Sequence, residues 1–112
     1  MQGEYKTLSE FWPFYLGEHS SSLNRKFHFV GSTLALFFLG LTIITLEIIY
    51  IPAAIFSGYF FAWMGHFLIE KNRPATFKYP LKSLASDWIM YYYTITGQIN
   101  SQLKHYNIQV KP

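Results

Sequence analysis

Two histidines, His19 and His28, lie nine residues apart just before the most apolar part of this 112-residue chain. A third, His66, lies near the end of that apolar part. Imidazole nitrogens are common ligands of first-row transition metals. The chain has no cysteine, which excludes thiolate ligands, disulfides and a cysteine nucleophile. Imidazoles without thiolate suit Fe(II), Zn(II) or another first-row metal, and iron with open coordination positions suits chemistry with dioxygen. We therefore predict that His19, His28 and His66 bind a metal ion.

Polar residues accompany two of these histidines at helical spacing. Asn24 lies four residues before His28, and Glu70 lies four residues after His66, so each pair shares one face of a helix. Glu70 is predicted either to bind the metal directly or to accept the second ring N–H of a ligating imidazole. The alternative is that Glu70 pairs with a basic residue at the end of its helix.

Basic residues flank the same positions. Arg25 and Lys26 precede the first apolar run, and Lys71 and Arg73 follow the second. Guanidinium and ammonium groups bind carboxylates, so we predict that Arg25, Lys71 and Arg73 hold a substrate carboxylate. The expected substrate is an amphipathic acid whose head group reaches the metal while the rest extends into lipid. The same basic residues also fit a simpler role in setting membrane topology.

Two long apolar runs must position these side chains. Residues 29–46 carry no charge, and at 1.5 Å per residue they span about 27 Å, close to the hydrocarbon thickness of a bilayer. Residues 48–69 contain no Asp, Glu, Lys or Arg, and Pro52 suits the first turn of a helix there. We predict an all-α integral membrane protein in which spans at about 29–46 and 52–69 form a transmembrane hairpin. The alternative is a hairpin buried in a compact soluble bundle.

The composition also favours a membrane protein. The chain is 51% hydrophobic and 21% aromatic but only 13% charged, about half the charged share of a soluble domain. A net charge of +3 is too small to indicate nucleic-acid binding and fits contact with anionic lipid headgroups. The length predicts one helical membrane domain over residues 1–112. A small hairpin that carries glycines also suits self-association into a homo-oligomer.

The distribution of charge predicts an orientation. Lysine and arginine lie at both outer ends of the hairpin, whereas the connecting loop carries only Glu47. The positive-inside rule then places both ends, and the candidate site with them, on the cytoplasmic side of a multi-pass protein. For a bacterial protein this is the inner membrane.

The charged flanks also predict the depth of the histidines. His28 lies about 4.5 Å beyond Arg25 along its helix, and His66 lies about 7.5 Å before Lys71 along the other. Both imidazoles therefore lie just inside the cytoplasmic boundary. A helix that begins at the serines of residues 20–22 leaves His19 in the preceding loop, from which it can fold back over the helix end.

Less regular segments flank the hairpin. We expect Pro13 to prevent a continuous helix through the mixed, aromatic-rich stretch of residues 4–16, unless a helix begins near this proline. Residues 81–96 predict a further helix that either lies along the interface or crosses the membrane as an additional tilted segment. His105, in a polar tail without a partner at useful spacing, is predicted to be an ordinary surface residue.

Two stretches carry a resemblance to a known family. "HSSSLNRKFHFVGS" at residues 19–32 and "GHFLIEKNRPATFKYP" at residues 65–80 resemble a family of small membrane proteins that was long catalogued as a domain of unknown function. Its characterised fungal member is an endoplasmic-reticulum 2-hydroxy fatty acid dioxygenase. The resemblance extends over roughly residues 11–97.

The resemblance implies Fe(II)-dependent α-oxidation, in which a 2-hydroxy fatty acid reacts with O2 and leaves a fatty acid one carbon shorter. By position, His19, His28 and His66 match the family's histidines and are the implied iron ligands. Three further positions match its other polar residues, as ligands or as partners of ligands: Asn24, Glu70 and Asn72.

Two other classes of function remain open at this point. Histidines at matched depth on two membrane helices are also how haem b is held. A non-enzymatic membrane adaptor would use the same histidines for structure alone.

Overall fold

The computed structural model describes residues 5–112 of the chain, so the first four residues of the predicted 1–112 domain lie outside the described residues. Within that range the fold is all-α, as predicted, and the only strand-like pairing is an isolated bridge between Ser21 and Lys111. The elements in chain order are α1 (Leu8–Gly17), α2 (Ser22–Thr45), α3 (Tyr50–Met64), the π-helix η1 (Gly65–Glu70), the 3-10 turn η2 (Ala75–Phe77), α4 (Pro80–Ile95) and α5 (Ile99–His105).

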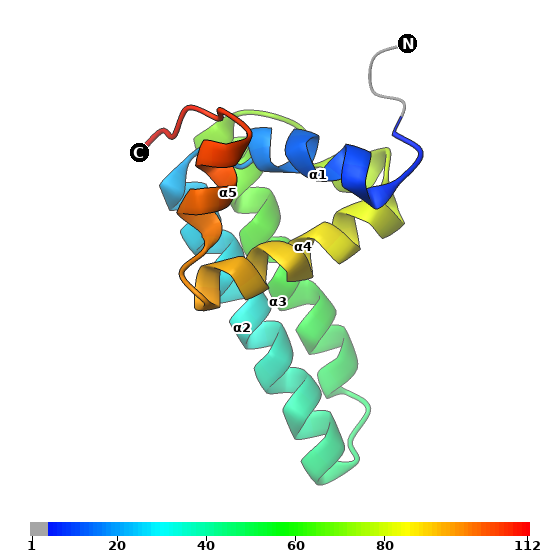
Figure 1. The fold of residues 1–112 in the computed structure, drawn as a ribbon. Helices are drawn as coiled ribbons and strands as arrows, with labels where there is room; N and C mark the ends of the chain where they lie inside the picture. The colour runs from blue at the N-terminus through cyan, green and yellow to red at the C-terminus, as the bar shows by residue number, and fades with distance from the viewer. Residues whose placement is uncertain (1–4) are drawn as a thin grey trace.

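An antiparallel hairpin of α2 and α3 forms the long axis of the molecule, and its closed tip projects away from all other elements (Figure 1). Helix Ser22–Thr45 and the continuous helix Tyr50–Glu70, formed by α3 and η1, are long and apolar enough to cross a membrane, with mean hydropathies of 2.0 and 1.3. The first helix contains residues 29–45 of the predicted span 29–46 and begins seven residues earlier, and the second contains all of the predicted span 52–69. Only 17% of the most apolar stretch of each helix is buried. A hairpin in the core of a soluble bundle would be mostly buried, whereas this one leaves a large apolar surface for a bilayer.

Local sequence signals set the ends of the hairpin helices. The hydroxyl of Ser21 caps α2 by accepting the backbone N–H of Asn24 at 3.3 Å, which confirms the predicted start of this helix. Helix α2 ends at Thr45, and its C-cap residue Leu46 adopts a left-handed conformation with φ of 60°. Pro52 lies in the first turn of α3, where its missing N–H has no helical acceptor to lose.

The two hairpin helices approach closely at a glycine. A Cβ atom added to Gly31 would lie 3.0 Å from both the Gly58 carbonyl oxygen and the Phe61 Cβ. Gly40, on the same helix, has no such neighbour within 4 Å. The missing side chain of Gly31 therefore permits the backbone contact that holds α2 against α3.

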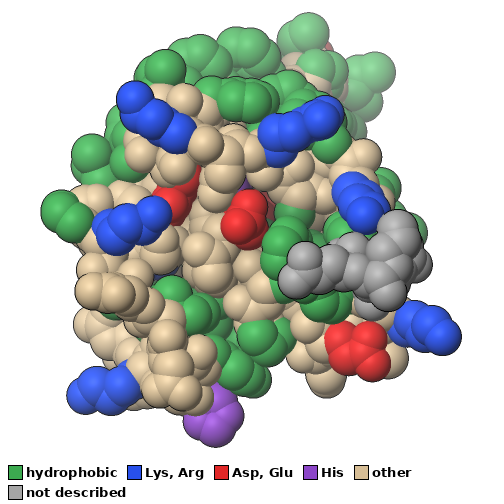
Figure 2. All heavy atoms as spheres, turned by 90° about the horizontal axis from the view of Figure 1, so that it is seen from above, with side chains coloured by type: hydrophobic (Ala, Val, Ile, Leu, Met, Phe, Trp, Pro, Cys, Tyr) green, Lys and Arg blue, Asp and Glu red, His purple; other side chains and the backbone are tan. Residues whose placement is uncertain are grey.

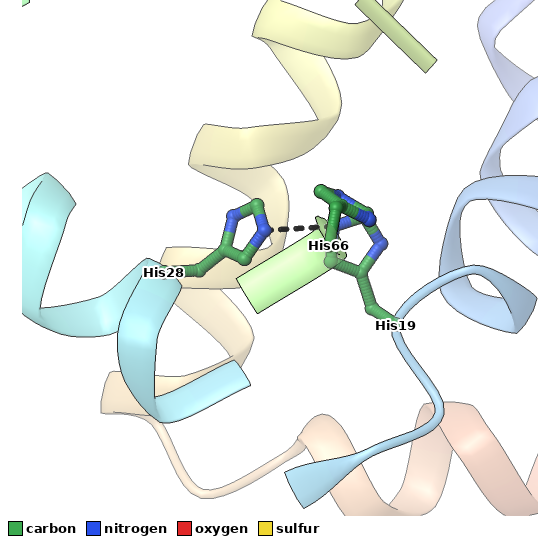
Figure 3. Close-up of side chains that lie close together, drawn as sticks. All are labelled: His19, His28 and His66. Atoms are coloured by element: carbon green, nitrogen blue, oxygen red, sulfur yellow. Dashed lines mark hydrogen bonds between the residues drawn. The ribbon is translucent and has the colours of Figure 1, made fainter. Parts of the chain in front are cut away.

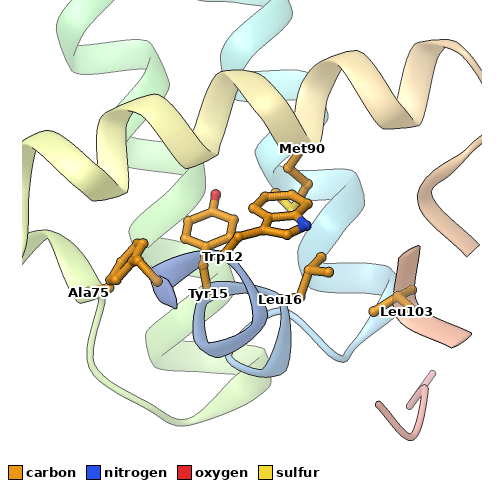
Figure 4. Close-up of a cluster of buried hydrophobic side chains, with 7 residues drawn as sticks. Trp12, Tyr15, Leu16, Ala75, Met90 and Leu103 are labelled. Carbon is orange, nitrogen blue, oxygen red and sulfur yellow. The ribbon is translucent and has the colours of Figure 1, made fainter. Parts of the chain in front are cut away.

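The remaining helices form a cap over the open end of the hairpin. Helix α4 runs across the hairpin and contacts both α1 and α2 (Figure 1). The hydrophobic core lies in this cap, where α1 packs against α4 and lies beside α5 (Figure 4). Its buried members are Phe11, Trp12, Tyr15, Leu16, Ala75, Met90 and Leu103.

The expectation that Pro13 interrupts the aromatic segment is wrong, because α1 continues through it from Leu8 to Gly17. A proline at this interior position costs about 3 kcal/mol through its missing hydrogen bond and the clash of its ring. Burial of a large apolar side chain contributes about 1.5–3 kcal/mol, and α1 buries four: Phe11, Trp12, Tyr15 and Leu16. The burial of these side chains within the cap therefore outweighs the unfavourable effect of Pro13 on the helix.

The close approach at Gly31 makes a testable prediction. Gly31→Ala should lower the free energy of unfolding by about 1–3 kcal/mol, because its methyl group would press on backbone atoms that have no room to move. Gly40→Ala is the matched control and should raise it by about 0.5–1 kcal/mol, because alanine is the better helix former in open space. Denaturant unfolding in detergent micelles measures both, and equal effects at the two sites would contradict the packing described.

Candidate metal centre

The three predicted histidines meet where the cap covers the hairpin, although they come from three different elements (Figure 3). His19 follows α1, His28 lies in α2 and His66 lies in η1. One ring nitrogen from each lies within 4.8 Å of the others, and the Nε2 atoms of His19 and His28 are 3.1 Å apart. The three residues are only 1%, 6% and 2% exposed.

Hydrogen bonds on the outer side of the cluster select the ring tautomers. His19 Nδ1 lies 2.7 Å from the Tyr15 carbonyl oxygen, and His66 Nδ1 lies 2.7 Å from Asn72 Oδ1. The Asn72 amide is oriented by its Nδ2, which donates to the Glu18 carbonyl at 3.1 Å. Because both partners of the Nδ1 atoms are acceptors, each Nδ1 carries the proton and each Nε2 keeps a lone pair. This is the arrangement that metal-ligating histidines require.

Burial keeps the cluster uncharged. It places the pKa of His19 well below its ordinary value, and the neighbouring rings of His28 and His66 oppose a charge there as well. At neutral pH His19 is therefore a neutral imidazole with a lone pair available. Three neutral nitrogen donors with no thiolate suit Fe(II) or Zn(II), so the residues present fit the metal that the sequence predicts.

A π-helical turn presents His66 to the cluster. Lys71 caps the C-terminal end of η1 in a left-handed conformation with φ of 60°, and the backbone N–H of Asn72 then donates to the His66 carbonyl at 3.0 Å. The wide turn brings the side chain of Asn72 back onto the ring of His66. Single π-turns within α-helices are frequent at functional sites, and nothing in the sequence pattern revealed this one.

Tyr15 and Asp87 belong to the site but were missed by sequence reasoning. The ring of Tyr15 stacks on His19 with centroids 4.1 Å apart, and its hydroxyl donates to Asp87. Asp87 Oδ1 also lies 4.0 Å from His28 Nδ1, and burial raises the pKa of this carboxyl to about 7. The sequence offered one signal: Tyr15 precedes His19 by four residues and can contact it across one helical turn.

Glu70 lies outside the group of converging ligand atoms. One carboxylate oxygen accepts the backbone N–H of Ser21 at 2.6 Å and the side-chain amide of Asn24 at 3.4 Å. The other accepts the Ser20 hydroxyl at 3.4 Å and lies 3.5 Å from Lys111 Nζ. The structure therefore places Glu70 as a link between the end of η1, the start of α2 and the C-terminal segment, with Asn24 fully buried beside it.

The three basic residues predicted to bind a carboxylate occupy different places. The buried guanidinium of Arg25 donates to the carbonyl oxygens of His19 and Ser20 at 2.7 and 3.0 Å. Lys71 and Arg73 are exposed, on the capped end of the molecule that lysine and arginine side chains surround (Figure 2). Only Arg25 lies within the centre, where it fixes the loop that carries His19.

Asn72 provides a test of the outer contacts. Asn72→Ala removes the acceptor of the His66 Nδ1–H, and loss of such a partner typically weakens metal binding by about 10–100-fold. Competition with a chromophoric chelator measures the affinity for added Fe(II). Arg73→Ala, an exposed neighbour, is the control and should bind like the parent protein, whereas unchanged affinity in Asn72→Ala would refute this role.

Arg25 provides a second test. Arg25→Met leaves the His19 and Ser20 carbonyls buried without their donor, so the free energy of unfolding should fall by about 2–4 kcal/mol and metal affinity should fall with it. Lys26→Met, at an exposed position, should change neither. If stability and metal affinity stay at the parent level while the Michaelis constant for an acidic substrate rises, Arg25 acts on substrate and not on the His19 loop.

Comparison with known proteins agrees with the resemblance of the two motif stretches. Residues 5–99 match the family described as 2-hydroxy-palmitic acid dioxygenase Mpo1-like. This match covers most of the chain, so the protein belongs to that family. No curated protein and no solved structure matches the chain significantly.

Proposed function

We propose that this protein is a membrane-embedded, Fe(II)-dependent dioxygenase that converts 2-hydroxy fatty acids into fatty acids one carbon shorter. The observation that carries the proposal is the convergence of three buried imidazoles in a chain whose family is named for a 2-hydroxy-palmitic acid dioxygenase. The family name supports the class of reaction, and the cluster supports a metal as its agent.

His19, His28 and His66 would hold the iron through their Nε2 atoms. Bound there, ferrous iron would supply the one-electron chemistry that lets ground-state O2 react with a closed-shell acid. The three imidazoles leave coordination positions free for substrate, as catalytic metal sites require. The Tyr15 carbonyl and the Asn72 amide hold two of the rings in the required tautomer.

The proposed reaction balances with one molecule of O2. The bond between C1 and C2 of the 2-hydroxy acid breaks, C2 becomes the carboxyl carbon of the shortened acid, and C1 leaves as CO2. The four electrons released by the two carbons reduce O2, so that one molecule of water is formed. No further reductant is required, so one molecule of O2 is consumed for each molecule of acid that is shortened.

The protein's basic residues would attract and hold the acidic head group. Arg25 supplies a buried positive charge at the centre, where a carboxylate gains most from it. Lys71 and Arg73 are exposed and would raise the local concentration of anions at the mouth of the site. The predicted carboxylate-binding roles of these three residues are part of this proposal.

The proposal places the hairpin across a membrane with its capped end in the cytoplasm, the inner membrane of a bacterial cell. Isoleucine and phenylalanine near the tip are widely exposed, among them Ile43, Ile44 and Phe56 at 76%, 80% and 67%. Such a surface is costly in water and favourable in lipid. The basic side chains gather at the other end, which suits the positive-inside rule.

The geometry favours a bare ion over haem. The ring centroids of the three histidines lie 4.4, 4.4 and 5.1 Å apart, which leaves no room for a porphyrin between any two of them. A purely structural role for the histidines, as in an adaptor, predicts instead that the Nε2 atoms of His19 and His28, which lie 3.1 Å apart, share a hydrogen bond, and that the protein binds no metal.

The test is metal content together with oxygen uptake. Protein purified anaerobically in detergent should contain nearly stoichiometric iron without a Soret band, and should consume one O2 for each 2-hydroxy acid shortened. His28→Ala and His66→Ala should lose the iron and reduce the rate by at least about 100-fold. His105→Ala changes an exposed histidine outside the cluster and should match the parent protein.

Three results would contradict the proposal. If the folded protein bound no Fe(II) on reconstitution, the proposed metal centre would be wrong. Stoichiometric zinc with no oxygen uptake would point to hydrolysis. A Soret band that disappears in His28→Ala would favour haem.

A further inference from the structure

A cavity adjoins the histidine cluster but extends away from it into the hairpin. Its volume is about 220 Å³, and α2, α3 and α4 enclose it. His28 is the one member of the cluster that lines this cavity. The cavity therefore leads from the metal centre toward the apolar half of the molecule.

The lining of the cavity changes from polar to apolar along its length. On α2 the lining residues are His28, Ser32, Ala35 and Leu39, which share one helix face at successive turns. Asp87 of α4 joins His28 at the polar end. From His28 to Leu39 the helix rises about 16 Å. An extended hydrocarbon of roughly a dozen carbons has this length, since each C–C bond of about 1.5 Å advances the chain by somewhat less than its own length.

Small side chains make the space. Ala54 and Ala62 of α3 are 3% and 9% exposed and line the cavity together with Gly58. A Cβ atom added to Gly58 would lie 3.9 Å from the Cβ of Ala35 across the gap. Larger residues at these positions would occupy the cavity, so its volume depends on four small residues from two helices.

The cavity opens toward the apolar surface of the hairpin. Leu39, Ile55 and Leu84 line it and are 39%, 58% and 44% exposed. They belong to three different helices and mark its rim. A ligand entering here would pass from lipid into the protein without crossing water.

We propose that this cavity holds the acyl chain of a long-chain fatty acid, with the carboxyl end at His28 and the methyl end toward Leu39 and Ala54. Its depth then sets which chain lengths fit. The identity of the head group rests on the proposed function, whereas the placement of the chain rests on the cavity itself. A polar end beside the cluster and an apolar remainder match one amphipathic acid better than the acyl chain of an intact phospholipid, whose head group has no room beside buried His28.

Labelling tests the placement of the chain without iron or turnover. Metal-free protein is irradiated with a C16 fatty acid that carries a diazirine at mid-chain, and the labelled residues are mapped by mass spectrometry. We expect labels on cavity residues of α2 and α3, with competition by 2-hydroxypalmitate. A phosphatidylcholine with the same diazirine is the control and should label the outer faces. Identical patterns from the two probes would overturn the proposal.

Chain-length preference tests the depth of the cavity. Ala54→Leu should lower the ratio of kcat/KM for C16 over C10 2-hydroxy acids by roughly tenfold or more, since hydrophobic pockets discriminate by this factor. Ala53→Leu is the matched control, because Ala53 is the adjacent residue and does not line the cavity, and it should leave the ratio unchanged. Leu39→Ala, at a rim position where the side chain is 39% exposed, should shift the preference toward longer chains.

The outcomes separate the two proposals. Labels within the cavity without oxidation of any acid would contradict the proposed function and support the acyl-chain site. Oxidation with the same ratio of kcat/KM for C16 over C10 acids in Ala54→Leu, Leu39→Ala and the parent protein would contradict the acyl-chain site and support the proposed function.

Discussion

The rest of the structure depends on the burial of three neutral imidazoles whose outer protons need acceptors. A buried N–H without a partner costs about 1–3 kcal/mol, so the cluster is stable only if other elements supply those partners. The Tyr15 carbonyl of α1 and the Asn72 side chain after η1 supply two of these acceptors, and Asp87 of α4 lies 4.0 Å from the third ring, that of His28. Helices α1 and α4 and the loop after η1 are thus positioned by packing around a site that none of them could form alone.

This requirement explains how the molecule divides its apolar surface. The cap keeps a hydrophobic core of the ordinary kind, in which Phe11 and Leu16 are fully buried. The hairpin instead leaves most of its apolar surface outside, and its helices meet through small residues such as Gly31. The histidines lie where the buried core of the cap meets the apolar surface of the hairpin. At that level a side chain is shielded from water by the cap, yet remains next to the part of the hairpin that suits lipid.

The sequence predicted the parts of this design that have a period or a charge pattern. Both spans, the start of α2 and the convergence of His19, His28 and His66 follow from hydropathy, serine caps and helical rise. It could not predict the π-turn of η1, because a single wide turn changes no hydrophobic periodicity. It failed for α1, where tertiary burial outweighs the local cost of Pro13. It also could not assign the hydrogen bonds of Arg25, because a guanidinium binds a backbone carbonyl as readily as a carboxylate and only the folded chain brings the carbonyls of His19 and Ser20 to it.

The position of the centre also bears on the energetics of the proposed substrate. Moving an acyl chain from lipid into water costs about 0.8 kcal/mol for each methylene, so a chain of roughly a dozen carbons would lose about 10 kcal/mol if an enzyme took it from solution. A cavity that opens onto the apolar face of the hairpin at Leu39 and Ile55 avoids this cost, because the chain moves from one apolar environment to another. Only the head group must then leave the interface, and it reaches a buried centre where Arg25 supplies positive charge. In the proposed arrangement, binding energy is therefore available for holding the reacting carbon in place rather than for extracting the chain.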